Sequence, residues 1–349
     1  MNFFKISETD KTIAIQKLKN IGIDALGIIP ASATLTYGKY REIVDNGVPP
    51  QLEYLRRNAE CRAGFESLMP GTKSIVCCAI AMPRLAETAP CKFARFCALG
   101  NYHDVFRDAL GQLDGMLRDL YPIQNSRICV DSAPILEREL AVRAGLGSIG
   151  FNHMVIHPEL GSFIALGELL LDVDLSGETW LNYRTGPFNA QSLVPGAHGC
   201  CDPSKRRCVA ACPTHALTAN GYDYHRCIAY WTTQHKGEIP EEFASAMGDV
   251  LWGCDRCQNA CPRSGKYVGA SRPSPLETLE IVEILTLSGK ALRKRLENSP
   301  LFDAAPNMVQ RNAAIVAGNT HDTRYRDILE SVAQNHACDW VRATAVRSL

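Results

Sequence analysis

The sequence lacks any long apolar run and any excess of one charge. Its longest apolar stretches, such as SIVCCAIAM, fall far short of the ~20 residues that span a bilayer. The N-terminal stretch MNFFKISETDKTIAIQKL has no basic start, apolar core or small-residue cleavage site of a secretory signal. Basic and acidic residues balance at 37 each, so any nucleic acid must be held by a local basic patch. We therefore expect a cytoplasmic protein with no membrane partner.

Cysteine is abundant, with 15 in 349 residues. The cytoplasm keeps thiols reduced, so we do not expect these cysteines to form disulfides. Seven are scattered, mostly in apolar segments where a buried thiol acts as a small hydrophobe. The other eight lie within 62 residues: Cys200, Cys201, Cys208, Cys212, Cys227, Cys254, Cys257 and Cys261. This concentration predicts a metal or iron–sulfur site.

The spacing of these eight cysteines favours iron–sulfur clusters. CVAACP and GCDRCQNACP both end in C-x3-C-P, the ending of the run that binds a [4Fe–4S] cluster. In two-cluster ferredoxins the cysteine before each proline ligates the cluster of the other motif. That rule assigns the cysteines to two sets: Cys212, Cys227, Cys254 and Cys257 in one, and Cys200, Cys201, Cys208 and Cys261 in the other.

The first set of spacings is unusual, because the loop DPSKRR replaces a two-residue spacer after the adjacent pair Cys200 and Cys201. Both members of this pair must then serve as ligands of one cluster. Zinc is the alternative, since it also binds four cysteines. Zinc sites usually pair two CxxC knuckles and do not need the C-x3-C-P ending, which favours clusters.

Strands and helices alternate in the first half of the chain. We predict buried strands in DALGIIPA, KSIVCCAIAM and SRICVDSAP, a long helix from about Tyr102, and a second helix in ILERELAVRAGLGSIG. HMVIHPELGSFIALGELLLD is typical of a strand, a turn and another strand. The alternation predicts a mixed α+β or α/β fold with an α/β domain at 1–175.

Three further segments follow this α/β domain. Residues 176–197 are polar and interrupted by glycine and proline, which is typical of a linker or insertion. Residues 198–270 form the predicted double-cluster, ferredoxin-like domain. Residues 271–349 have a helical pattern similar to a short HEAT-like region.

Several segments resemble those of epoxyqueuosine reductases. CVDSAPILERELAVRAGLGSIG is similar to the active-site segment of that family, and RAGFESLMPGTKSIV, HPELGSFIALGELLLD, RCIAYWTTQHKGEIP, GCDRCQNACP and RNAAIVAGNTHD fit further segments in order. The resemblance implies base-off cobalamin between the α/β and cluster domains, two [4Fe–4S] clusters and an external electron donor. It also implies reduction of epoxyqueuosine to queuosine in the tRNA anticodon loop, the final step of queuosine biosynthesis. The chain has no D-x-H-x-x-G signature of histidine-ligated cobalamin, so the corrinoid rests on the resemblance.

Asp131 is the candidate proton donor. A carboxylate at the carboxyl end of a buried strand lies where open α/β sheets bind ligands. Removal of an epoxide oxygen as water needs protons, and an aspartic acid can supply one if burial raises its pKa toward neutrality. By position alone, a helix-capping role is an equal alternative. The resemblance favours catalysis.

The resemblance also implies the contacts of the corrinoid. On the α/β side these are Arg62, Asp131, Val155 and Leu166, and on the cluster side they are Gln234, His235, Lys236 and Asp255. Val155 and Leu166 would act largely through their backbone. Tyr102 and His103 begin a helix, where a structural histidine is the commoner outcome.

The chain departs from the family pattern at several positions. Phe151 stands in place of a lysine and Ser148 in place of a tryptophan, Asn101 occurs where DYH normally begins, and the helical tail is short. Two groups of basic residues remain that could contact phosphates, although such runs are often only solvated faces. They are Lys205, Arg206 and Arg207, and Lys290, Arg293, Lys294 and Arg295.

These departures leave two other functions open. The first is a cobalamin and iron–sulfur reductase of a small molecule, as in reductive dehalogenases. The second is an electron-transfer protein with no substrate of its own. We expect a monomer in each case.

Overall fold

The chain folds into two compact units, each assembled from segments that are separated in sequence. The computed structural model describes residues 8–197, 199, 201–218, 221–265 and 267–349. Unit 1 contains the described residues up to 81, then 103–206 and 262–270; unit 2 contains 82–102, 207–261 and 271–349. The predicted domain boundaries near residues 175, 197 and 270 stay predictions, since the units combine segments from several predicted domains.

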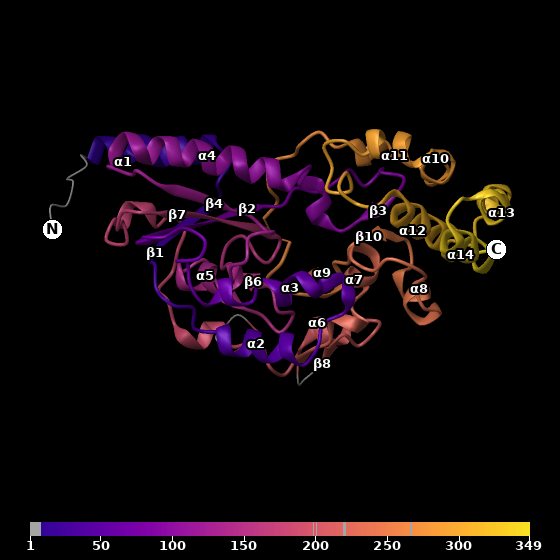
Figure 1. Cartoon of the computed structure of the whole chain (residues 1–349), viewed down its shortest axis with the longest axis horizontal. Coiled ribbons are helices and arrows are strands. Elements are labelled where there is room, and N and C mark those ends of the chain that lie inside the picture. Colours follow the sequence, from indigo (N-terminus) through magenta and orange to yellow (C-terminus); the bar gives the residue numbers. More distant parts are fainter. Residues whose placement is uncertain (1–7, 198, 200, 219–220, 266) are drawn as a thin grey trace. The chain divides into compact units, whose positions relative to one another are not determined.

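A four-stranded antiparallel sheet forms the centre of unit 1 (Figure 1). Its strand order is β1 (Ala25–Pro30), β2 (Ser74–Ala81), β7 (Ile164–Leu171) and β4 (Ser126–Cys129). The strands predicted from apolar runs are present, and β2 is buried along its whole length. The expectation of a buried strand is wrong for β4, where only Cys129 is buried. All three neighbouring pairs are antiparallel. The rule for open parallel sheets therefore does not apply to Asp131.

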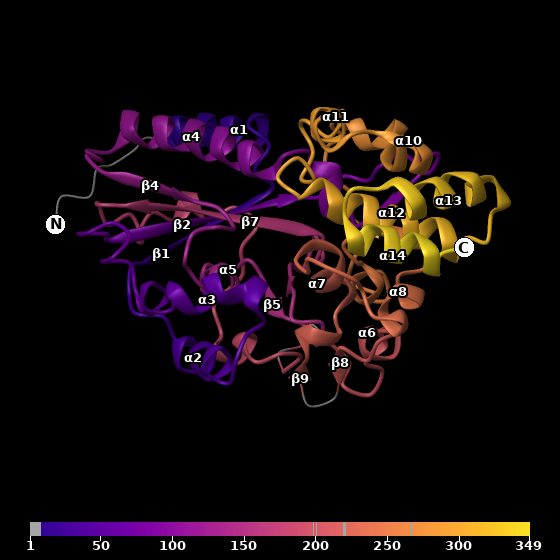
Figure 2. The same ribbon diagram turned by 45° about the vertical axis from the view of Figure 1, so that its right-hand side comes forward.

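Helices cover both faces of this sheet. α1 (Glu8–Asn20) and α4 (Tyr102–Leu120) lie on one face and α5 (Glu137–Arg143) on the other (Figures 1 and 2). The Phe106 ring of α4 packs against Gly167 so closely that a Cβ there would lie 2.5 Å from a ring carbon. On the opposite face, Leu140 of α5 shares a core with Cys77 and Cys129.

Shorter elements complete unit 1. They are α2 (Tyr37–Asp45), α3 (Glu53–Arg57), β5 (Ser148–Ile149) and β6 (Val155–Ile156), with β5 paired antiparallel to β6. The predicted insertion at 176–197 has no strand and contains two short 3-10 helices, Thr179–Leu181 and Ala190–Leu193. It is anchored to the sheet, because Leu26 of β1 forms a bridge with Tyr183. Other 3-10 helices of unit 1 are Pro50–Leu52 and Glu60–Ala63.

Unit 2 is mainly helical. Its helices are α6 (Arg207–Ala210), α7 (Ile228–Thr233), α8 (Glu241–Met247), α9 (Arg256–Asn259), α10 (Ile281–Thr286), α11 (Gly289–Arg295), α12 (Pro306–Asn319), α13 (Arg326–Asn335) and α14 (Asp339–Arg347). Its strands are β3 (Lys92–Phe93), β8 (Leu217–Thr218), β9 (Gly221–Tyr222) and β10 (Val250–Trp252), paired β10 with β3 and β8 with β9. The predicted helices after residue 271 are confirmed, while their likeness to HEAT repeats stays a prediction. Among the described residues, none of the helices combines the length and apolarity needed to cross a membrane.

Arg311 of α12 is the central polar residue of unit 2. Its side chain is fully buried, and burial lowers its pKa to about 9. The guanidinium donates hydrogen bonds to the backbone oxygens of Trp231, His235 and Gly237 over 2.8–3.0 Å. It also donates to Asn312 Oδ1. Arg311 therefore fixes the loop that follows α7.

We predict that Arg311→Met lowers the free energy of unfolding by about 3–5 kcal/mol, because three partly buried carbonyl groups lose their donor at about 1–3 kcal/mol each. Urea unfolding followed by tryptophan fluorescence measures this change. Arg324→Met is the matched control, because the Arg324 side chain is 79% exposed, and it should leave the midpoint unchanged. Equal midpoints for both variants would contradict the anchoring role of Arg311.

Candidate functional site

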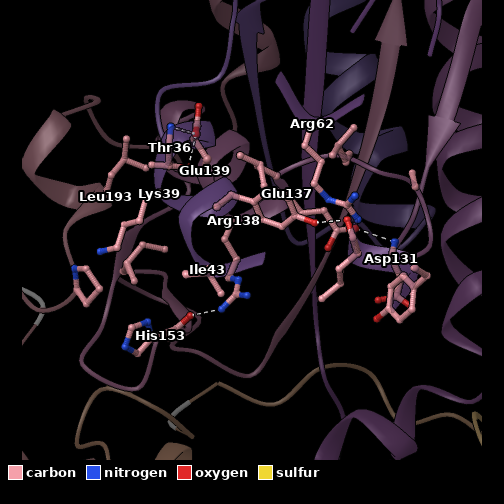
Figure 3. Close-up of a pocket in the computed structure, with 18 residues that line it drawn as sticks. Thr36, Lys39, Ile43, Arg62, Asp131, Glu137, Arg138, Glu139, His153 and Leu193 are labelled. Carbon is pink, nitrogen blue, oxygen red and sulfur yellow. Dashed lines mark hydrogen bonds between the residues drawn. The ribbon is translucent and has the colours of Figure 1, made fainter. Parts of the chain in front are cut away.

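Unit 1 contains a cavity of about 400 Å³ that brings charged groups of both signs together. Its walls come from α2, α3, the turn after β4, α5 and the segment around residues 193–195. Arg62, Asp131 and Glu137 gather at one end, and Lys39 and His153 lie at the other (Figure 3). Burial, together with the cations Arg138 and Lys39, lowers the pKa of His153 to about 4, so this histidine is neutral at physiological pH.

Asp131, the predicted proton donor, lines this cavity from the turn after β4. Its backbone has a φ of 46°, in the left-handed region that aspartate adopts more readily than most residues. Its side chain is 59% exposed, so the expectation of a buried acid at this position is wrong. One carboxylate oxygen lies 3.7 Å from His103 Nε2. The weakly predicted histidine is thus a neighbour of the candidate acid.

Glu137, the first residue of α5, is the carboxylic acid whose acidity the fold changes. Its Oε1 accepts a 2.7 Å hydrogen bond from the Asp131 backbone N–H. Burial, and then the negative charge of Asp131, raise the pKa of Glu137 to about 7, against the opposing effects of that N–H, Arg138 and Arg62. Glu137 therefore exchanges a proton near neutral pH. The sequence analysis missed it because the glutamate in ILER was attributed to the start of a helix.

Glu168 of β7 is a second acid that the sequence analysis missed. It is fully buried, and neither carboxylate oxygen has a hydrogen-bond partner among the described residues. On the neighbouring strands its direct partners are Cys77 of β2 and Cys129 of β4. Burial, and then the proximity of Glu137, raise its pKa well above the ordinary value. A single glutamate inside the apolar run IALGELLL was the available signal, since carboxylates are seldom fully buried without a partner.

The other residues predicted to contact a corrinoid on the α/β side lie in different surroundings. Arg62 lines the cavity; it is buried, donates to the Asn58 backbone oxygen, and stacks over the Tyr40 ring at 5.1 Å. Val155 of β6 and Leu166 of β7 do not line the cavity. The structure thus brings together two of the four predicted residues, Arg62 and Asp131.

The remaining predicted contacts, Gln234, His235, Lys236 and Asp255, belong to unit 2. The Asp255 carboxylate accepts a 2.5 Å hydrogen bond from the Arg95 backbone N–H and a longer one from the Gln258 amide. Burial raises its pKa. Asp255 therefore has a clear structural task within unit 2, and the contact of these four residues with a corrinoid stays a prediction.

Six of the eight predicted ligand cysteines lie in unit 2, and four of them are within electrostatic reach of one another. The pKa of Cys257 is raised to about 12 by burial and then by the negative charges of Cys254, Cys227 and Cys208. No described group of three or more His, Cys, Asp or Glu residues is arranged to hold a metal ion. Ligation of clusters by these cysteines therefore stays a prediction.

Cys212 lies in a different environment from the other cysteines of unit 2. Burial raises the pKa of its thiol. Hydrogen bonds from the backbone of Leu217 and from Thr214 and Ala216 lower this pKa by more than burial raises it, so the net shift is downward. Such donors stabilise a thiolate, the form that binds iron. Cys201 belongs to unit 1, and Cys200 lies outside the described residues. Ligation by this adjacent pair stays a prediction.

The structure shows the surroundings of Phe151, which departs from the family pattern, and of the second basic group. The Arg206 guanidinium lies 4.8 Å from the centre of the Phe151 ring, so the ring that replaces a lysine carries a cation above it. In the second basic group, Lys290, Arg293 and Lys294 are exposed. Arg295 instead binds Glu283 and the Pro275 backbone oxygen, both at 2.7 Å. Arg295 is thus engaged within unit 2, and a phosphate contact of this basic group stays a prediction.

Comparisons with known proteins agree with this arrangement. Residues 62–132 match the family model "Epoxyqueuosine reductase QueG, DUF1730", and residues 201–264 match the "4Fe-4S double cluster binding domain". The epoxyqueuosine reductase of Escherichia coli K12 is 30% identical over 322 residues, which cover 87% of this chain and 80% of the relative. The chain belongs to the epoxyqueuosine reductase family. The family is one of oxidoreductases, and the matched cluster domain accounts for the cysteine-rich segment.

Two solved structures of epoxyqueuosine reductases are similar along most of the chain. One is in complex with an epoxyqueuosine-modified tRNA-Tyr stem loop; it is 27% identical, has a TM-score of 0.78, and the match covers 97% of this chain and 88% of the other. The other, from Bacillus subtilis, has its aspartate-bearing catalytic loop swung out of the active site. It is 27% identical with a TM-score of 0.76, and the match covers 97% and 89% of the two chains. The mixed α/β fold class is thereby confirmed.

We predict that Glu137→Gln changes how the stability of the protein depends on pH. The folded-state pKa is raised from 4.5 to about 7, so the folded protein holds a proton that the unfolded chain releases between these values. Stability from this group is present below pH 4.5 and is lost as the pH rises to about 7, which amounts to about 3 kcal/mol. The unfolding free energies of wild type and variant are measured by urea titration across this range. The value for the wild type minus that for the variant should fall by the same amount as the pH rises. A constant difference would contradict the raised pKa.

Proposed function

We propose that this chain reduces the epoxide of epoxyqueuosine to the alkene of queuosine in the anticodon loop of tRNA. The observation that carries the proposal is the 30% identity to the Escherichia coli epoxyqueuosine reductase over 322 residues. The similar structure solved with an epoxyqueuosine-modified stem loop supports tRNA as the substrate. The enzyme would act in the cytoplasm as a monomer supplied by an external electron donor.

The reaction requires both electrons and protons. Both carbon–oxygen bonds of the epoxide break, a carbon–carbon double bond forms, and the oxygen leaves as water. This change consumes two electrons and two protons. The double-cluster domain at residues 201–264 is suited to carry the electrons. The acidic end of the cavity in unit 1 is suited to supply the protons.

A corrinoid would contact the residues that the family resemblance implies. These are Arg62, Asp131 and the backbone of Val155 and Leu166. The resemblance also implies Gln234, His235, Lys236 and Asp255. When bound, cobalamin supplies a reduced metal that delivers electrons to carbon. The cavity contains a buried arginine and an exposed aspartate, which are suited to bind the polar side groups of such a cofactor. The assignment of cobalamin rests on the family resemblance.

Asp131 would donate a proton to the epoxide oxygen. Its loop begins after the short strand β4, and the positive φ makes this turn a local departure from regular structure. The exposed side chain matches the behaviour of the Bacillus subtilis relative, in which the aspartate-bearing catalytic loop swings out of the active site. We infer that the Asp131 loop moves inward when the substrate binds.

The direct test of the proposed function is anaerobic turnover of a stem loop carrying epoxyqueuosine, with chemical reductant as electron source. Appearance of queuosine by mass spectrometry is the expected result. Binding of the stem loop should weaken steeply as salt rises, because phosphate contacts release counterions. Reduction of a small epoxide with no reduction of the stem loop would favour the small-molecule alternative instead.

We predict that Asp131→Asn lowers kcat for the stem loop by about 10²–10⁴-fold, because the amide cannot donate a proton as an acid. Binding of the stem loop and the content of iron should be unchanged. Asp119→Asn, a matched change at an exposed position of α4, should turn over as wild type does. Normal turnover by Asp131→Asn would remove Asp131 from the proton-donor role.

We predict that Cys227→Ser lowers iron and acid-labile sulfide by about half, since the loss of one thiolate should release one of two cubanes. Cys338→Ser changes a half-buried cysteine of the same unit that belongs to no motif, and it should leave the iron content unchanged. Iron and sulfide are measured after anaerobic purification. Unchanged iron in Cys227→Ser, or zinc in the wild type, would overturn the ligand assignment.

A further inference from the structure

The proposed reaction needs more protons than one aspartate holds. Two protons enter for each epoxide that becomes an alkene and water, and the two electrons come from a one-electron iron–sulfur or flavin protein through the clusters. Asp131 can give one proton and must then be protonated again. A further proton-holding group close to Asp131 is therefore a chemical requirement of the proposed function, on which this inference rests.

Glu137 lies where such a group is needed. It lines the same cavity as Asp131, and its Oε1 accepts the 2.7 Å hydrogen bond from the Asp131 backbone N–H (Figure 3). The positions of the two residues are thus fixed relative to each other by the backbone, whichever way the Asp131 carboxyl group turns. Arg62 and Arg138 also line the cavity beside Glu137, and they limit how far its proton affinity rises.

Glu168 lies behind Glu137 in the core between the sheet and α5. Its two oxygens are buried without hydrogen-bond partners among the described residues, so an ionised carboxylate there would be strongly destabilised. Three thiols of β2 and β4 lie within electrostatic reach of it: Cys77, Cys78 and Cys129.

The thiols around Glu168 are themselves neutral, because burial raises the pKa of each. The charged groups that face this region are few. Arg127 of β4 donates to the Leu68 backbone oxygen, and Arg143 of α5 pairs with Glu139 at 3.4 Å. Neither cation forms a hydrogen bond with Glu168. Glu168 consequently remains a neutral acid beside Glu137.

We propose that Glu137 is the proton reserve of the site, returning a proton to Asp131 after each transfer, and that Glu168 is a permanently neutral acid that seals the core behind it. In each cycle the Glu137 O–H bond breaks as the Asp131 O–H bond forms, and Glu137 regains its proton from solvent through the cavity. Glu137 acts through Asp131 and does not touch the substrate. Because Glu168 stays neutral, it adds no negative charge beside Glu137.

Infrared spectroscopy tests the two protonation states without turnover. Protein carrying glutamate labelled with ¹³C at the side-chain carboxyl group is titrated from about pH 5 to about pH 9, a range in which free glutamate is ionised. We expect one labelled carbonyl band of a protonated acid that persists throughout and is missing in Glu168→Gln. A second band should disappear near pH 7 and be missing in Glu137→Gln. Absence of both bands from the wild type would overturn the proposal even if neither variant folds.

Kinetics separates a proton reserve from a merely structural acid. In single-turnover and steady-state assays with the epoxyqueuosine stem loop, wild-type kcat should fall as the pH rises through about 7, because the protonated form of Glu137 is then lost. Glu137→Gln preserves the hydrogen-bond acceptor for the Asp131 N–H. It should have kcat lowered by about 10²-fold at neutral pH, a flat profile in this range and an unchanged KM.

Two further variants complete the kinetic test. Glu168→Gln replaces one neutral group by another and should keep the wild-type profile. Glu159→Gln, at a side chain that is 62% exposed, is the matched control and should also behave as wild type. A wild-type pH profile in Glu137→Gln would overturn the proposal. If no preparation reduces the stem loop, the proposed function fails, whereas the infrared result still decides the protonation of Glu137 and Glu168.

Discussion

The hydrogen bond from the Asp131 backbone N–H to Glu137 is the interaction on which the site in unit 1 depends. It joins the turn after β4 to the first residue of α5 and holds a backbone with φ of 46°. To accept this bond, the Glu137 carboxylate must lie beside Asp131 in the half-buried wall of the cavity. The same placement that positions the turn therefore raises the proton affinity of Glu137. The hydrogen bond itself lowers the pKa of Glu137, so burial and the charge of Asp131 outweigh it.

Much of the fold could be predicted from local sequence patterns. The apolar runs identified the sheet strands, and the spacing of apolar residues identified α4, whose buried face includes Phe106, Leu110 and Leu113. The cysteine spacing predicted two [4Fe–4S] clusters, in agreement with the matched double-cluster domain. These features were accessible because each is specified by residues that are near one another in the chain, or by a repeated motif.

The rest of the site depends on contacts between distant segments. The antiparallel strand order places Glu168 between Cys77 and Cys129, and no local pattern contains that arrangement. Exposure of Asp131 likewise follows from the turn geometry, which the run VDSAP does not specify. Arg295 resembled its basic neighbours in sequence, yet it binds Glu283 of the preceding helix α10. In each case the decisive partner lies on another element.

The cysteines illustrate how environment assigns different chemistry to one residue type. Burial in the core of unit 1 raises the pKa of Cys77 and Cys78 well above the ordinary value, so these thiols stay protonated. In unit 2, backbone donors lower the pKa of Cys212. The pKa of Cys257 is raised by burial and by other thiolates, and the second of these effects is a repulsion that bound iron relieves. A high cysteine content therefore does not define a cluster site by itself; the polar groups and neighbouring thiolates around each sulfur decide which cysteines can serve as ligands.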